Sequence, residues 1–114
     1  MIPNIEWAEG LDCAITVCDM ELNVIYMNNK SAEVFSKWGG LNLIGKSLRD
    51  CHNQRSLDIM QRLISQKQSN SYTIEKKGIK KIIHQTPWYK DGKVAGLVEI
   101  SIELPVDMPH FVRE

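Results

Sequence analysis

A cysteine and a histidine stand next to each other near the middle of the sequence, at Cys51 and His52. A thiolate is a nucleophile and a redox group, and a neutral imidazole is a good ligand for haem iron. The two residues do not predict a hydrolytic pair, because adjacent side chains rarely face each other and no third group is placed to orient the histidine. The sequence also carries no metal-ligand spacing and no paired carboxylates for acid–base work. We therefore expect binding chemistry at these residues, and we do not expect an enzyme.

The segment that follows them predicts the longest helix of the chain. Asn53 can cap its start, because a short side-chain acceptor satisfies free backbone N–H groups there. The helix is expected over residues 54–66, with an apolar stripe at Leu57, Met60 and Ile64. The start of a helix can lower the pKa of a nearby thiol, so the cysteine before the cap is either redox-sensitive or a buried, unreactive residue.

Strands are predicted before this helix. Residues 13–18 and 24–27 are rich in β-branched and apolar side chains, and the polar turn between them favours an antiparallel hairpin. A shorter helix follows, capped by Asn28 or Asn29 and ended by the two glycines after Trp38. The chain therefore begins its fold as two strands that lead into helical structure.

Three further strands are predicted after the longest helix. They cover residues 71–75, 79–89 and 93–104, with turns at Lys77–Gly78 and Asp91–Gly92. In the last strand apolar and polar residues alternate, so one face is expected to pack and the other to face water. Two strands, then helices, then three strands predict an α+β fold with one five-stranded antiparallel sheet and helices packed on one face.

Composition limits the number of domains and the kinds of partner. The 114 residues suit one domain, and 14 basic residues balance 14 acidic ones, so neither nucleic acid nor a membrane is an expected partner. No apolar run approaches the ~20 residues that span a bilayer, and the first ten residues do not resemble a signal peptide. Three cysteines without a CxxC pair argue against a disulfide framework. We expect a cytoplasmic protein with a leading cap over residues 1–10, a domain over 11–104 and a tail over 105–114.

The order of elements over residues 11–104 is similar to that of the PAS family. The stretch CAITVCDMELNVIYMNNKSAEVF resembles the first hairpin of that family, with its Asp-led turn and an Asn before a helix. The stretch LIGKSLRDCHNQRS resembles the segment before the long central helix, and YKDGKVAGLVEISIEL resembles the closing strand pair with its D-G turn. The resemblance implies a PAS-like sensor module of bacterial signalling proteins, including two-component and transcription regulators.

The resemblance also implies a cavity between the sheet and the central helices. Members of the family bind haem, flavin, small acids or other metabolites there, or stay empty and only dimerise. We expect a small molecule in the cavity and a signal relayed through a homodimer or a partner protein, although the sequence does not name the molecule. The residues expected to line the cavity and bind the ligand or cofactor are Val17, Phe35, Leu48, Cys51, His52, Met60, Ile83 and Ile100.

Two alternatives stay open. In the first, the protein is a haem-based gas or redox sensor with His52 as the axial iron ligand, although this histidine precedes the helix and haem-binding members often place theirs within it. Cys51 lies in the region of the reactive cysteine of flavin-binding members, but the Phe and Leu that wall the flavin are missing, which argues against flavin. In the second, the protein is a ligand-free dimerisation module with an apolar patch on the outer sheet face or on Ile5 and Trp7.

Overall fold

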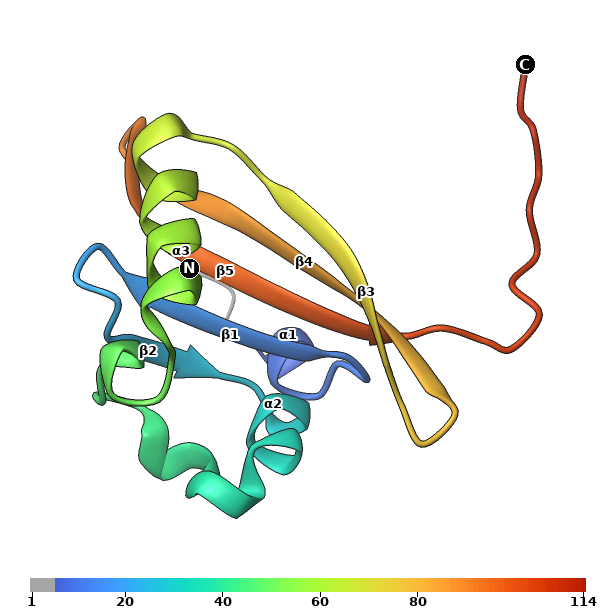
Figure 1. The fold of residues 1–114 in the computed structure, drawn as a ribbon, viewed down its shortest axis with the longest axis horizontal. Helices are drawn as coiled ribbons and strands as arrows, with labels where there is room; N and C mark the ends of the chain where they lie inside the picture. The colour runs from blue at the N-terminus through green and yellow to red at the C-terminus, as the bar shows by residue number, and fades with distance from the viewer. Residues whose placement is uncertain (1–5) are drawn as a thin grey trace.

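The computed structural model describes residues 6–114 and contains one antiparallel sheet of five strands (Figure 1). The strand order is β2-β1-β5-β4-β3, so the first and last strands of the chain lie side by side in the centre of the sheet. Together with the helices packed on the sheet, this confirms the predicted α+β architecture. The strands are β1 (Ala14–Asp19), β2 (Val24–Met27), β3 (Asn70–Lys76), β4 (Ile79–Lys90) and β5 (Lys93–Glu103).

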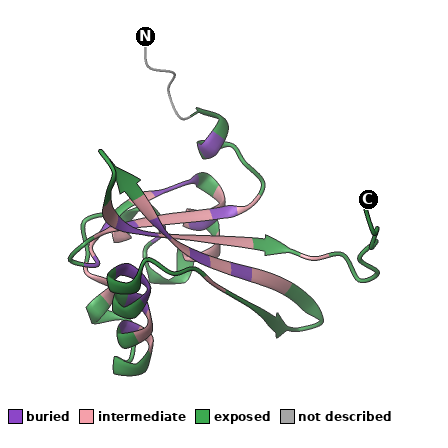
Figure 2. Ribbon diagram, turned by 90° about the horizontal axis from the view of Figure 1, so that it is seen from above, coloured by how far each residue is buried: buried purple, intermediate pink, exposed green. Residues whose placement is uncertain are grey.

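The helices between β2 and β3 pack on one face of this sheet, as predicted, whereas the short leading helix lies on the other face. The longest, α3 (Gln54–Gln66), packs over β4 and β5, and α2 (Asn29–Val34) packs against β1. The short α1 (Glu6–Glu9) lies on the opposite side of the sheet from α3, as both views show (Figures 1 and 2). Between α2 and α3 the chain forms three 3₁₀ turns, which are η1 (Ser36–Trp38), η2 (Gly40–Leu43) and η3 (Leu48–Asp50).

The start of α3 confirms the predicted cap. Asn53 accepts a hydrogen bond from the backbone N–H of Ser56 at 2.8 Å, which satisfies one of the free donors of the first turn. The apolar stripe of the helix is buried against the sheet, and α3 ends where Lys67 takes a left-handed conformation with φ of 55°. The buried residues of this stripe are Leu57, Met60, Leu63 and Ile64.

Asn28 joins α1, β1 and α2 at one fully buried position. Its Oδ1 accepts hydrogen bonds from the N–H groups of Ile15 and Ser31, which caps α2. Its Nδ2 donates to the carbonyl oxygens of Ala8 and Cys13. All the hydrogen-bonding capacity of this amide is thus used inside the protein, and one side chain holds the leading segment to the sheet.

The sheet register decides which side chains face the helices. In the antiparallel pair of β1 and β5, Thr16 lies opposite Glu99 and Cys18 lies opposite Leu97, and these four side chains point toward the helical side. The residues that alternate with them along the two strands point to the outer face, among them Ile15, Val17, Val98 and Ile100. The apolar row of the last strand therefore faces away from the helices, and the core on the helical side is formed by α3 and a few residues of the sheet and its turns.

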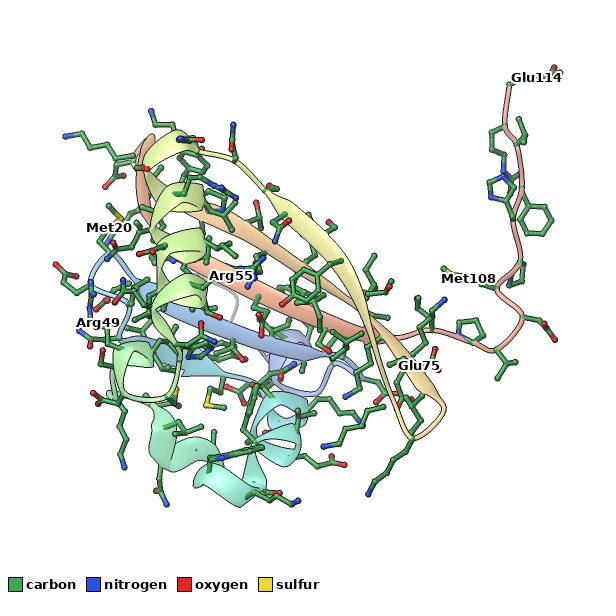
Figure 3. All side chains as sticks on the ribbon, viewed as in Figure 1. Met20, Arg49, Arg55, Glu75, Met108 and Glu114 are labelled. Atoms are coloured by element: carbon green, nitrogen blue, oxygen red, sulfur yellow. The ribbon has the colours of Figure 1, made fainter. Side chains whose placement is uncertain are left out.

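The ends of the described chain lie outside the sheet. Trp7 of α1 has 68% of its surface exposed, whereas the neighbouring Ala8 is buried. Ile5, the other residue of the predicted leading patch, lies outside the described residues. The tail after β5 contains no helix or strand, and its side chains from Met108 to Glu114 extend away from the domain (Figure 3). Within residues 6–114, no helix is long and apolar enough to cross a membrane.

Candidate ligand cavity

A cavity of about 300 Å³ lies between the inner face of the sheet and the helical segments. This volume is at the lower end of the range in which proteins bind small molecules. Most of its surface is apolar or aromatic, and a few polar groups converge on it. The lining residues are Thr16, Cys18, Val24, Met27, Phe35, Trp38, Leu43, Leu48, Cys51, His52, Met60, Gln85, Leu97 and Glu99.

Five of the eight residues expected at the cavity line it, namely Phe35, Leu48, Cys51, His52 and Met60. They come from the segment that runs from the end of α2 into α3, on the helical side of the sheet.

The other three expected residues lie elsewhere. Val17 and Ile100 are on the outer face of the sheet, because their neighbours Cys18 and Glu99 point inward and successive strand residues alternate. Ile83 is buried on the inner face, two positions along β4 from Gln85, but it does not line the cavity. The residues of the sheet that do line it were not foreseen from the sequence, and they include the polar Thr16, Gln85 and Glu99.

Cys51 and His52 form the rim of the cavity together with the backbone of η3. The Nδ1 atom of His52 lies 3.0 Å from the carbonyl oxygen of Leu48 and 3.2 Å from Sγ of Cys51. Because a carbonyl oxygen only accepts, the first contact places a hydrogen on Nδ1, which leaves Nε2 of a neutral imidazole as an acceptor. The two side chains touch although they are adjacent in the sequence, since both turn back toward the same carbonyl group.

The environment of Cys51 does not activate its thiol. Partial burial raises the pKa of Cys51, and the nearby charge of Asp50 raises it further. This corrects the expectation of a pKa lowered by a helix start, because α3 begins three residues later and Asn53 already caps it. The alternative of a buried cysteine is also wrong, since Cys51 as a residue is exposed and its thiol is only partly shielded from water.

A directed chain of hydrogen bonds crosses the polar side of the cavity. Asn70 Nδ2 donates to Gln85 Oε1 at 3.2 Å, and Gln85 Nε2 donates to Glu99 Oε1 at 3.1 Å. The register places the three residues opposite one another on β3, β4 and β5. Nearer β2, the hydroxyl of Thr16 is hydrogen-bonded to that of Ser31. The sheet therefore presents one carboxylate to a cavity that is otherwise largely apolar.

Residues 8–104 match the PAS fold family, and the chain therefore belongs to this family. A search of curated proteins by sequence found no match.

Solved structures show the same fold at low sequence identity. The Vibrio cholerae VqmA dimer has a TM-score of 0.70 and 17% identity over 96% of this chain, which spans 56% of the VqmA chain. The PAS domain of the histidine kinase ThkA has a TM-score of 0.65 and 16% identity, covering 79% of this chain and 97% of that domain. The Aer2 receptor of Vibrio cholerae, described as a dual PAS–haem oxygen sensor, has a TM-score of 0.65 and 13% identity, covering 86% and 99%.

Proposed function

We propose that this chain is a signal-sensing PAS module that binds a small molecule in its cavity and relays the bound state through a homodimer or a partner protein. The observation that carries the proposal is the cavity of about 300 Å³, with apolar walls and a few converging polar groups. VqmA has been solved bound to DPO and as a dimer, which gives a precedent within the same fold. We propose binding without catalysis, since the raised pKa of Cys51 keeps the thiolate scarce at neutral pH.

The outer face of the sheet offers a route for the relay. Ile15 lies opposite Ile100 and Val17 lies opposite Val98, so the two central strands carry a continuous apolar row on that side. Glu99 stands between two of these residues on β5 and points into the cavity. A ligand that moves Glu99 therefore acts on the same strand segment that forms the outer row. We propose that a second copy of the chain covers this row, because half-exposed apolar side chains gain from burial.

Native mass spectrometry of freshly purified protein tests ligand binding and dimer formation together. We expect a bound small molecule, and we expect Leu48→Trp to remove it because the larger side chain fills the cavity. Ile44→Trp is the matched control, since Ile44 is exposed and does not line the cavity. A protein that carries no molecule, and takes up none from a small-molecule extract of cells, would contradict the proposal.

Substitutions that introduce a charge into the outer apolar row test whether the protein relays its state through a dimer. Val17→Lys and Ile100→Lys place an ammonium group in the proposed interface, so we expect light scattering to show a shift from dimer to monomer. Thr73→Lys adds the same charge at an exposed position of the edge strand β3 and should leave the dimer intact. A wild-type protein that is monomeric at high concentration rules out the homodimer.

Haem remains a second candidate because of the geometry of His52. Its Nδ1 contact with the Leu48 carbonyl leaves Nε2 free as an acceptor, which is the arrangement that orients histidine ligands of metals. The cavity itself fits haem poorly, because within residues 6–114 no lysine or arginine lines it to pair with the two propionates, and the carboxylate of Glu99 does line it. A Soret band on haem addition that His52→Ala abolishes would support this candidate, and an unchanged band would exclude it.

A further inference from the structure

The hydrogen bonds on the polar side of the cavity run in one direction and end at Glu99. A carboxylate only accepts, so Gln85 must turn its Nε2 toward Glu99 and its Oε1 toward Asn70. The reverse orientation of the amide would place two acceptors against each other. Gln85 is 8% exposed, so its amide is held inside the protein by these two partners. The chain of amides therefore supplies Glu99 with one donor and leaves its remaining acceptor capacity to whatever occupies the cavity.

The described residues provide no cation that neutralises the charge of Glu99. No lysine or arginine of residues 6–114 forms an ion pair with Glu99, and none lines the cavity. The charge of Glu99 contributes to the raised pKa of two nearby side chains, Tyr72 and Cys18. Burial raises the pKa of Tyr72, and the charge of Glu99 raises it further, while burial of Cys18 raises its pKa with smaller contributions from Asp19 and Glu99. Among the described residues, Glu99 is the one carboxylate that lines the cavity, and no lysine or arginine lines it.

The opposite walls would hold an apolar body. Phe35 and Trp38 meet edge to face with their ring centroids 6.2 Å apart, and both line the cavity. Met60 adds a polarisable thioether from α3. Aromatic faces and a thioether also favour a neighbouring cation over an anion. These walls and the carboxylate together define one class of ligand.

We propose that the cavity selects a small molecule with a protonated amine, or another strong N–H donor, attached to an apolar or aromatic body, and that Glu99 accepts the hydrogen bond from this donor. The proposal rests on the proposed function, since it names the class of ligand for the same cavity. A small anion such as a carboxylic acid is disfavoured, because it would be placed against an unneutralised carboxylate.

Three single-ring probes that differ in one group test this proposal. Benzylamine is cationic, benzyl alcohol is neutral and benzoate is anionic, and their binding can be followed through the NMR signal of the Trp38 indole at the cavity. We expect benzylamine to bind wild-type protein about tenfold more tightly than benzyl alcohol, as a charge-assisted hydrogen bond predicts, and benzoate to bind most weakly. This ranking needs no variant.

Two isosteric variants test whether the preference for benzylamine depends on Glu99. Glu99→Gln should weaken benzylamine binding about tenfold and leave benzyl alcohol within about twofold, because it removes the charge and keeps the shape. Glu103→Gln removes a carboxylate from the same face of β5 at an exposed position away from the cavity and should change neither affinity.

The outcomes separate this inference from the proposed function. If the probes enter the cavity but benzoate binds as well as benzylamine, or Glu99→Gln leaves benzylamine binding unchanged, the amine preference is overturned and the binding cavity stands. If none of the three probes shifts the Trp38 signal at millimolar concentration, the amine preference is overturned, and native mass spectrometry alone then decides whether the cavity binds a ligand. Only the expected ranking together with the loss in Glu99→Gln supports the amine preference.

Discussion

The side chain of Asn28 donates a hydrogen bond from Nδ2 to the carbonyl oxygen of Ala8 at 2.9 Å. This contact joins residues twenty positions apart and fixes α1 on the side of the sheet opposite α3. Because Asn28 is fully buried, water cannot replace the amide if it is lost. The leading segment is thus attached to the domain through a position that also caps α2.

Asn28→Asp should release α1 while keeping the cap of α2. The carboxylate still accepts from Ile15 and Ser31, but it faces the carbonyl oxygens of Ala8 and Cys13 with no donor. We expect a loss of about 2–4 kcal/mol in the free energy of unfolding, measured with urea.

Hydrogen exchange locates the effect of Asn28→Asp. The amide of Gly10, which donates to the Glu6 carbonyl within the α1 turn, should exchange faster. Asn29→Asp is the control, because Asn29 is exposed at the start of α2 and an acidic group is favourable there. Equal stability of the two variants would show that Asn28 does not hold the leading segment.

Gly96→Ala should be among the most damaging single changes in the sheet. Gly96 has φ of +156°, and a Cβ there would lie 1.9 Å from the carbonyl oxygen of Cys18 and 2.7 Å from Nε1 of Trp88. The Trp88 indole crosses this glycine to donate a hydrogen bond to the same carbonyl at 3.0 Å. The alanine therefore clashes with backbone that has no room to move, and we expect a loss of more than about 3 kcal/mol.

Two variants make the result at Gly96 interpretable. Gly92→Ala also substitutes a positive-φ glycine, but no atom lies within 4 Å of its Cβ, so it should cost only about 1–2 kcal/mol. Trp88→Phe removes the hydrogen bond without adding an atom at Gly96, and it should fold with a moderate loss. A cost at Gly96 no greater than that at Gly92 would contradict the close approach.

Gln85→Leu should destabilise the protein, because it leaves Asn70 and Glu99 without their hydrogen-bond partner. The change removes the acceptor of Asn70 and the donor to Glu99 at a position that is nearly fully buried. We expect a loss of about 1–3 kcal/mol in urea unfolding, because the two partners lose their hydrogen bonds in a partly dry cavity. Gln66→Leu, at an exposed position of α3, should change the stability by less than about 0.5 kcal/mol. Similar values for the two variants would mean that the amide chain is not part of the fold.

Local signals made most of the fold predictable from the sequence. The cap at Asn53 and the apolar stripe that follows gave the bounds of α3 as the structure has them, and the Asp91–Gly92 turn correctly separated the last two strands. Each of these features depends on residues within one turn or one helix face. The order of the elements then left few arrangements for one antiparallel sheet.

The cavity was predictable only on its helical side. Leu48, Cys51 and His52 lie in one stretch before α3, so placing the helix also placed them. On the sheet side, alternation shows that Glu99 and Ile100 face opposite ways but does not show which face meets the helices. Apolar Ile100 was expected to face inward, whereas the structure places it outward and turns Glu99 into the cavity. That choice depends on pairing between distant strands, which no local pattern encodes.

The reactivity of Cys51 provides a test at the rim of the cavity. Alkylation by iodoacetamide requires the thiolate, so a raised pKa moves the rate curve to higher pH and lowers the rate at neutral pH. We expect the half-maximal rate above about pH 8.5, the ordinary value for a free thiol, with peptide mass spectrometry separating Cys51 from Cys13 and Cys18. Partial burial is the main cause of the raised pKa, and the charge of Asp50 is the second.

Asp50→Asn separates these two causes. Removing the negative charge favours the thiolate, so the pKa of Cys51 should fall and alkylation at pH 7.5 should become about twofold faster. It should remain slower than alkylation of N-acetylcysteine, because the burial that contributes most is unchanged. Asp58→Asn removes a charge from α3 that does not affect this pKa and should leave the rate as it is in the wild type. A wild-type rate that levels off below pH 8 would show an activated thiol, and it would support the redox role that the raised pKa of Cys51 argues against.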